Sequence, residues 1–359
     1  MRKERKKRTV LYAGISAFAA LLVIVGIVYA LWEKPPETVL PEETPEAEII
    51  QVLPSSTPTP EPMPEGVKFE NSRQDGIYTM LLVGLDQMSG STDTILVGRF
   101  DTIKHEVNLV SIPRDTIVNI DMDVRKINSM YIGSLNYGGN GIDALKTQIR
   151  WLTGFEPDCY AVLDLNTFIQ VIDELGGVDF DVPEEMEYVF DDISHRLYVH
   201  LSPGMQHLDG IHAMALCRCR TGYITGDYGR IETQHAFLKA CADQFIQLGN
   251  IPHARAVANI LSENLNTNLS AGNIAWFMRQ LLQCRSDDIH LDTLPSEGRI
   301  LMGYSYAVPE LDEWLEMLNT RLNPYDHELG MWDLNMVYCD GTGYAGTQGY
   351  LDGDWYYQS

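Results

Sequence analysis

Short runs of β-branched and aliphatic residues, each bounded by turn-forming residues, predict the strands of a folded domain. Runs of four to eight such residues between Gly, Pro, Asn or Asp are typical of strands. Three of them follow one another closely near the start of the domain, and three more lie further along the chain. The six predicted strands cover residues 77–84, 94–100, 106–112, 159–163, 177–182 and 289–294.

Segments with helical periodicity separate the later strands. They cover residues 143–152, 165–175, 210–216, 227–248, 253–265, 271–284 and 309–322. Strands interleaved with helices favour a layered arrangement in which helices cover a sheet. We therefore predict an α/β (α+β layered) fold with a central mixed β-sheet flanked by helices.

The N-terminus has the pattern of a membrane anchor. Residues 1–9 form a basic tail, and residues 10–32 contain no charged side chain. A helix of about 20 apolar residues crosses a hydrocarbon core of about 30 Å. A cleavable signal peptide is the alternative, but its apolar part is usually about 7–15 residues long. We predict a single-pass transmembrane helix in the cell membrane, with a cytoplasmic N-terminus and an extracellular domain, because basic residues precede the apolar run.

Composition divides the rest of the chain. Residues 33–67 are rich in Pro, Glu and Thr and predict an extended linker that cannot bury enough apolar surface to fold. The folded domain is predicted for residues 68–329. Residues 330–359 are rich in Gly, Asp and aromatic residues without periodicity, and predict a C-terminal tail of unknown role.

Charge and cysteine content exclude several classes of protein. The formal net charge is −24, so the surface as a whole is unsuited to nucleic acid, and any anion site must be local. Six cysteines show no metal-ligand spacing, and both disulfides and buried thiols remain open. Nine histidines without an HExxH pattern argue against a histidine-bound zinc ion.

One segment concentrates positive charge within this acidic chain. It contains Arg218, Arg220 and Arg230, followed by Gln234. On an extended segment, residues two apart share a face, and a helix beginning at Asp227 places Arg230 in its first turn. Arginine forks and helix N-termini bind phosphate, so the segment predicts a phosphate or pyrophosphate site. Salt bridges to the many acidic residues are the alternative.

Two carboxylates are predicted to lie at one edge of the sheet. Asp86 follows the first strand and Asp93 precedes the second. Carboxylates opposite an anion suit Mg²⁺, which bridges carboxylate and phosphate oxygens, although aspartates also cap turns. Arg114 follows Pro113 at the end of the third strand, where it either serves this site or pairs with Asp115 at the surface. Lys126 lies in the next loop and is a further candidate anion contact, as is its neighbour Asn128.

The motifs that carry these residues resemble those of the LytR–CpsA–Psr (LCP) family. They are GLD…TDTI, SIPRD, KIN, GGVDFDVP and CRCRTGYITGDYGRIETQ, in this order behind a single predicted anchor. The resemblance covers roughly residues 77–248. It implies an Mg²⁺-dependent phosphotransferase that moves a glycopolymer, such as teichoic acid or capsular polysaccharide, from a polyprenyl-pyrophosphate lipid to peptidoglycan and releases polyprenyl phosphate. The prenyl chain would occupy an apolar tunnel between the sheet and the helices.

The resemblance also implies roles for single residues. Asp86 and Asp93 would bind Mg²⁺, and Asp93, Arg114 and Arg230 would be catalytic, with Asp93 as the candidate base. The pyrophosphate of the substrate would be held by Arg114, Arg218, Arg220, Arg230 and Gln234. Lys126 is added to this pyrophosphate-binding set because of its place in the loop after Arg114.

Two positions depart from the family pattern. Ser91 and Thr233 stand where the family often has arginine, and fewer positive charges bind pyrophosphate less tightly. Two other functions therefore stay open. One is a non-catalytic, membrane-anchored binder or regulator of cell-envelope precursors, and the other is a polyprenyl-pyrophosphate pyrophosphatase that uses water as acceptor.

Overall fold

A computed structural model describes most of the region predicted to fold. The described residues are 33–39, 73–85, 90, 92–136, 138–191, 196–219, 223, 227–248, 251–340 and 343–351. Within these ranges no helix combines the length and apolar character that a membrane crossing needs. The predicted span of residues 10–32 lies outside the described residues, so the anchor stays a prediction.

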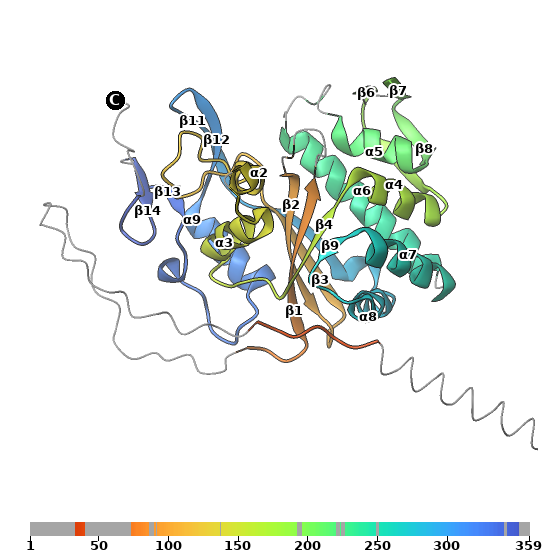
Figure 1. The fold of residues 1–359 in the computed structure, drawn as a ribbon, viewed down its shortest axis with the longest axis horizontal. Helices are drawn as coiled ribbons and strands as arrows, with labels where there is room; N and C mark the ends of the chain where they lie inside the picture. Colours follow the sequence, from red (N-terminus) through yellow and green to blue (C-terminus); the bar gives the residue numbers. More distant parts are fainter. Residues whose placement is uncertain are drawn as a thin grey trace, which may run out of the picture.

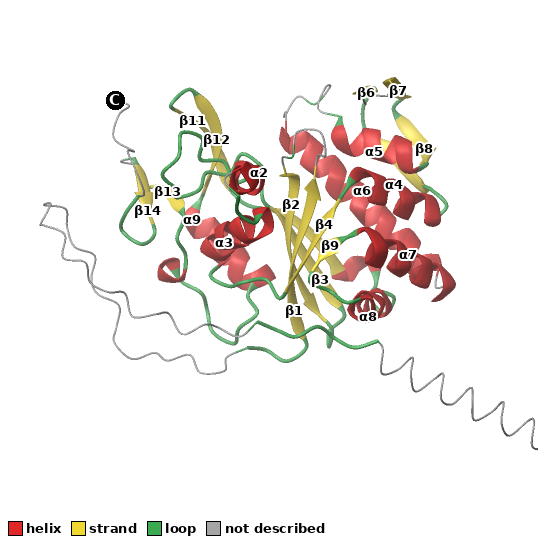
Figure 2. Ribbon diagram, in the orientation of Figure 1, coloured by secondary structure: helices red, strands yellow, loops and turns green. Residues whose placement is uncertain are grey.

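A six-stranded mixed sheet forms the centre of the molecule (Figures 1 and 2). Its strand order is β10-β3-β2-β1-β4-β9. The pairs β1–β4 and β10–β3 are parallel, and the other neighbours are antiparallel. The strands are β1 Ile77–Leu85, β2 Thr92–Asp101, β3 Glu106–Ser111, β4 Cys159–Leu163, β9 Asn266–Thr267 and β10 Ile289–Thr293. The predicted mixed sheet flanked by helices is confirmed.

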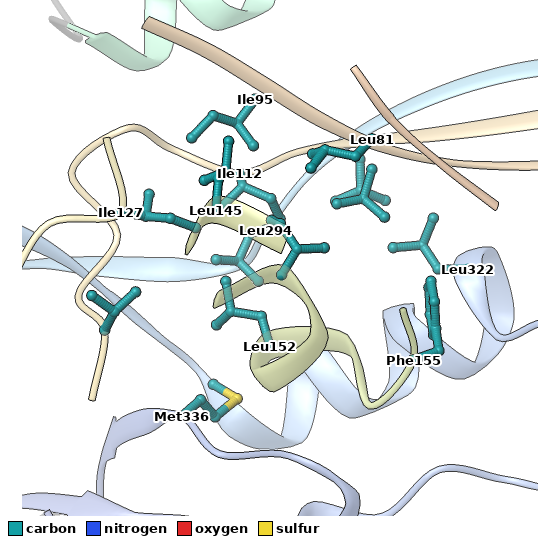
Figure 3. Close-up of a cluster of buried hydrophobic side chains, with 14 of the residues drawn as sticks. Leu81, Ile95, Ile112, Ile127, Leu145, Leu152, Phe155, Leu294, Leu322 and Met336 are labelled. Carbon is teal, nitrogen blue, oxygen red and sulfur yellow. The ribbon is translucent and has the colours of Figure 1, made fainter. Parts of the chain in front are cut away.

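One face of this sheet is covered by α3 (Gly141–Thr153), α9 (Leu311–Met317) and the π-helical turn η2 (Leu318–Leu322). Asn140 caps the start of α3, and Gly154 ends it in the left-handed conformation that favours glycine. Figure 3 shows side chains of these helices meeting those of the strands. Complete burial of such aliphatic side chains makes this layer a main source of stability.

The opposite face packs against α6 (Asp227–Leu248) and α8 (Ala271–Leu281). Aromatic contacts dominate here, because Tyr78 of β1 meets Trp276 and Phe277 of α8 edge to face, at centroid distances of 5.2 and 5.8 Å. A capping box at Ser270 begins α8. Both faces of the sheet are therefore buried, in agreement with the nearly continuous apolar runs of its strands.

A second lobe extends from the α6 side, to the right in Figure 1. It contains three helices and two antiparallel strand pairs around its own hydrophobic cluster. Of these elements, the strand pair β6–β7 and the strand β8 were not predicted from the sequence. The elements are α4 Leu165–Glu174, β5 Val178–Val182, β6 Met186–Asp191, β7 Arg196–Leu201, β8 Gly204–Leu208, α5 Gly210–Arg218 and α7 Ile251–Asn264.

Described residues beyond position 329 belong to the folded domain. Leu334 and Met336 are buried in the core of the α3 face, and Val337 is buried against the β11–β12 hairpin. The folded part thus continues past residue 329, where the sequence predicted a separate tail. The remaining elements are α2 Ser129–Asn136, η1 Ser286–Asp288, β11 Ser296–Leu301, β12 Tyr304–Pro309, η3 Met331–Asp333, β13 Val337–Cys339 and β14 Tyr344–Gly346.

Candidate functional site

A β-bulge positions Asp93 at the edge of the sheet. Leu85 pairs with Thr92 and Gly84 pairs with Thr94, so Asp93 is the additional residue between the two pairs. Bulges bend a strand and redirect a side chain. The Asp93 carboxylate is thereby presented at the start of β2, at the edge of the sheet that the sequence predicted for this aspartate.

Arg114 meets Asp93 directly. Its Nη1 donates to Asp93 Oδ1 at 3.0 Å, and both side chains are about one fifth exposed, at 21% and 17%. A tight turn holds the arginine, since the backbone N–H and the hydroxyl of Thr116 both donate to the Pro113 carbonyl. Asp93 and Arg114, predicted for the same edge, therefore form an ion pair there.

Lys126 lies in the neighbouring loop but has its own acidic partner. Its Nζ donates to Asp115 Oδ1 at 2.9 Å and lies 5.7 Å from the centre of the Tyr306 ring. The loop is tied to the arginine turn because the Asn128 N–H donates to the Arg114 carbonyl. Lys126 thus pairs with the aspartate that was predicted as the alternative partner of Arg114.

The helical side of the site begins at the end of α5. Arg218 is the last residue of this helix, so the prediction of an extended segment at Arg218 is wrong. Asp209 caps the start of this helix, and its apolar residues up to Leu216 are buried in the second lobe. The Cys219 N–H still donates to the Ala215 carbonyl, so the helical hydrogen bonding continues to the end of this segment. The guanidinium of Arg218 lies 5.9 Å from the centre of the Tyr188 ring of β6. Arg220 lies outside the described residues.

Arg230 occupies the first turn of α6, as predicted, and is only 2% exposed. A cation at the positive end of a helix dipole is unfavourable without an anion nearby. Arg230 also affects the neighbouring Cys217. Burial raises the pKa of the Cys217 thiol to about 12, while the positive charge of Arg230 lowers it. The first turn of α6 therefore combines a buried guanidinium with the N-terminal end of a helix, an arrangement suited to phosphate.

Gln234 and Thr233 tie α6 to its surroundings. The Gln234 amide donates to the Cys217 carbonyl at 2.8 Å, which connects α6 to the end of α5. Thr233, at the position where the family often has arginine, is buried and donates to the Gly229 carbonyl at 3.1 Å. Thr233 also forms a hydrogen bond with Tyr223. Burial raises the pKa of Tyr223, and the hydrogen bond with Thr233 lowers it. Thr233 thus forms hydrogen bonds inside the protein, with Gly229 and Tyr223.

Two contacts join the helical and strand sides. The Ser111 hydroxyl and His235 Nε2 lie 2.7 Å apart, and the Tyr228 hydroxyl and Ser296 Oγ lie 3.0 Å apart. Ser111 ends β3, three residues before Arg114, and His235 follows Gln234 on α6. The contact with His235 was not predicted from the sequence, although Ser111 begins the SIPRD motif.

Burial lowers the pKa of His235, whereas Asp292 and Glu232 act in the opposite direction. The neutral ring is therefore favoured beside Ser111. Next to this contact lies an open pocket of about 290 Å³ between α6 and the edge strand β10. It is lined by His235, Ala236, Lys239, Ile289, His290, Leu291, Asp292 and Arg321.

Asp93 suits a magnesium ion by its chemistry and position. Mg²⁺ prefers oxygen ligands, keeps several waters, and needs only one or two protein carboxylates together with phosphate oxygens. Asp93 provides one carboxylate beside an arginine. Asp86, the second predicted ligand, lies outside the described residues, as does Ser91. Among the residues that the structure describes, no group of three or more His, Cys, Asp or Glu side chains could hold a metal ion.

Comparisons with known proteins relate the chain to one family. A model of the LytR_cpsA_psr family matches residues 51–323. TagV of Bacillus subtilis, named a polyisoprenyl-teichoic acid–peptidoglycan teichoic acid transferase, is 31% identical over 202 residues, or 54% of this chain and 50% of TagV. Regulatory protein MsrR of Staphylococcus aureus is 29% identical over 208 residues, or 56% of this chain and 59% of MsrR. The chain thus spans only about half to three fifths of these relatives.

Solved structures share the fold. The crystal structure of B. subtilis TagV has a TM-score of 0.57 at 24% identity and covers 69% of this chain and 96% of that chain. TagT bound to LIIa-WTA has a TM-score of 0.55 at 20% identity and covers 70% of this chain and 92% of that chain. At this level of identity the likeness establishes a common fold.

Proposed function

Since the chain belongs to the LytR_cpsA_psr family, we propose that it is a phosphotransferase of cell-wall assembly. Its substrate is a glycopolymer linked through pyrophosphate to a polyprenyl lipid, and its acceptor is a hydroxyl of peptidoglycan. The proposal extends to the place of action: a domain outside the cell, anchored through the predicted span of residues 10–32. The name of TagV, which describes transfer of teichoic acid to peptidoglycan, supports the type of reaction.

The observation that carries the proposal is that charged residues lie at the strand ends and at the start of α6, two parts of the fold that the contact between Ser111 and His235 joins. On the strand side, Asp93 and Arg114 form an ion pair next to a bulge. On the helical side, Arg230 is buried in the first turn of α6. In a chain of net charge −24, such local concentration of arginine favours a highly charged anion, and pyrophosphate has the required charge and size.

In the proposed reaction, the acceptor hydroxyl attacks the phosphorus that carries the glycan. A new phosphorus–oxygen bond forms to the acceptor, and the bond to the bridging oxygen of the pyrophosphate breaks. The leaving group is polyprenyl phosphate, which takes the bonding electrons. Asp93 is the described carboxylate placed to accept the proton of the acceptor hydroxyl, provided that the hydroxyl lies within hydrogen-bond reach.

The arginines provide electrostatic stabilisation in this scheme. Negative charge builds up on the equatorial and leaving oxygens during phosphoryl transfer. Arg114 and Arg230 would hold these oxygens, and guanidinium groups do so with two parallel hydrogen bonds. Arg218 and Arg220 would extend the same surface along the substrate. Gln234, whose amide nitrogen is engaged by the Cys217 carbonyl, would fix the position of α6.

A magnesium ion fits the proposal as a cofactor held by Asp93 and Asp86. When bound, it neutralises charge on the phosphate oxygens. Asp93 then cannot both bind the ion and accept a proton through the same oxygen. The two roles would need its two carboxylate oxygens, of which Oδ1 also accepts from Arg114.

The proposal is tested with the full chain in lipid nanodiscs, supplied with a polyprenyl-pyrophosphate-linked glycan and peptidoglycan fragments. We expect polymer joined to the fragments and release of polyprenyl phosphate, both abolished by EDTA and restored by Mg²⁺. Asp93→Asn should lose activity, whereas Asp287→Asn, a change of equal charge on the exposed turn η1, should not. Release of lipid phosphate without joined polymer would indicate a pyrophosphatase. Tight binding without turnover would indicate a binder or regulator, and either result would overturn the proposed transfer.

A further inference from the structure

Residues 33–39 are fastened to the folded domain at two places far apart in the sequence. These residues begin the segment that the sequence predicted to be an extended linker. Figure 1 shows them in red, running below the sheet between α8 and the start of β1. We call Glu33–Val39 the strap.

The first attachment is to α8. The Glu33 carboxylate is almost completely buried, at 2% exposure, and its Oε2 accepts from Arg279 Nη1 at 2.9 Å. Asn273, in the first turn of α8, donates from Nδ2 to the Lys34 carbonyl at 2.8 Å. A buried carboxylate is costly unless it is paired, so these contacts hold the start of the strap against the helix.

The second attachment is to Asp158, just before β4. The Val39 N–H donates to Asp158 Oδ1 at 2.6 Å, while the backbone N–H and hydroxyl of Thr79 donate to Oδ2 at 2.7 and 2.9 Å. Arg73 forms an ion pair with the same carboxylate and donates to the Val39 carbonyl at 3.2 Å. Burial raises the pKa of Asp158, whereas Arg73 and the Thr79 and Val39 hydrogen bonds act in the opposite direction. Asp158 thus joins the strap to the start of the sheet.

The strap follows the predicted membrane span directly in the chain. Glu33 follows Trp32, the last residue of the predicted membrane span, without any intervening spacer. A prolyl pair, Pro35 and Pro36, stiffens the middle of the strap between its two attachments. A chain that leaves the bilayer at Trp32 therefore meets its own folded domain at the next residue.

We propose that the strap docks the domain directly on the membrane, with α8 and the beginning of β1 facing the lipid surface. The candidate phosphate site then lies at the far end of the sheet. Thr79 and Leu85 are six residues apart on β1, which at about 3.3 Å per residue amounts to roughly 20 Å. This orientation rests on the predicted span, and it does not depend on the proposed reaction, since no substrate contact enters it.

Hydrogen exchange of the full chain in nanodiscs measures the strap without any substrate. We expect the amide of Val39 to exchange slowly, and Asn273→Asp to speed exchange of the start of the strap by roughly 5-fold, the size expected for one lost hydrogen bond. Aspartate at this position keeps the acceptor that Ser270 uses in the capping box, so α8 stays capped. Arg279→Glu should have a larger effect, reduced again when combined with Glu33→Lys. Arg299→Glu, an equal charge change on the exposed β11–β12 hairpin, is the matched control. Slow exchange of β1 and β2 in each variant verifies folding.

A second measurement addresses the orientation. A fluorescent amino acid is placed at Arg285, close to the end of α8, or at Ile300, an exposed residue of the β11–β12 hairpin. Nitroxide-labelled lipid headgroups should quench the fluorophore at position 285 several-fold more strongly than that at position 300, and Asn273→Asp should reduce the difference. Equal quenching at both positions, or rapid exchange of the strap in the wild-type chain, would overturn the proposal.

Discussion

The two sides of the candidate site hold arginine in different ways. On the strand side, Arg114 is partly exposed and already engages Asp93 at 3.0 Å. On the helical side, Arg230 is 2% exposed, and its helix is anchored by Gln234 to the end of α5. A partly exposed ion pair can rearrange around a ligand at small cost, whereas a buried guanidinium is held by its surroundings. We infer that the helical side is rigid and the strand side adjusts.

The largest effect is expected on the rigid side. Arg230→Ala should lower phosphotransfer activity by at least about 100-fold, the usual consequence of removing one donor to the charge of a transition state. Arg230→Lys should recover little of it, because an ammonium keeps the charge but lacks the planar fork. Activity of the full chain is the measurement, with Arg285→Ala as the control. Wild-type rates in Arg230→Ala would remove this residue from the reaction.

A smaller loss is expected on the adjustable side. Arg114→Ala should lower activity by about 10- to 100-fold. Its free energy of unfolding should change by no more than about 1 kcal/mol, since partly exposed ion pairs contribute little. Chemical denaturation and activity are measured on the same preparation. A loss of stability well above that value with unchanged activity would make the pair with Asp93 structural.

The contact between Ser111 and His235, which joins the two sides, predicts that the stability of the fold depends on pH. The pKa of His235 is lowered from 6.5 by burial, with Asp292 and Glu232 acting in the opposite direction. The unfolded chain then binds more protons, so the contribution of His235 to stability is present above about pH 6.5 and is lost as the pH falls toward its folded pKa. His235→Gln keeps a side-chain amide near Ser111 and should flatten the decline between pH 6.5 and 5. A parallel decline in both proteins would assign it to other groups.

The smallest effect is expected at Lys126. Its ammonium is engaged by Asp115 and lies over Tyr306. Lys126→Met should therefore change activity less than about 3-fold and stability by less than about 1 kcal/mol. A loss of activity comparable to that of Arg114→Ala would show that Lys126 leaves Asp115 for the substrate, as the sequence prediction required.

The hydrophobic pattern of the sequence predicted the bounds of an element well where the element is long or buried on both faces. The bounds of β4 and α6 match those predicted, and β1, β2 and β3 differ by two residues or fewer. The strand pairs β6–β7 and β11–β12 were missed. In β11, for example, the sequence SEGRIL is mostly exposed and begins without an apolar run. Pro309 was predicted to begin a helix but ends β12, with Ser296 as its partner.

The candidate site was predictable to the extent that it follows strand ends. Asp93 and Arg114 each adjoin a buried strand, so their meeting at one edge followed from the order of the strands. The bond between Ser111 and His235 joins residues 124 positions apart. No periodicity or composition signals such a pair, because it depends on how α6 crosses the sheet.

The sequence by itself determined the charge, the strand and helix pattern of the core, the family motifs and the predicted span, because these depend on residue type and local spacing. Only the tertiary structure decided that Arg218 ends a helix, that Thr233 is an internal contact, and that Leu334, Met336 and Val337 complete the cores. It also decided that Glu33 meets Arg279, 246 positions away. Composition describes how a segment behaves in water, whereas docking depends on the partners that the fold brings to it, here α8 and the carboxylate of Asp158.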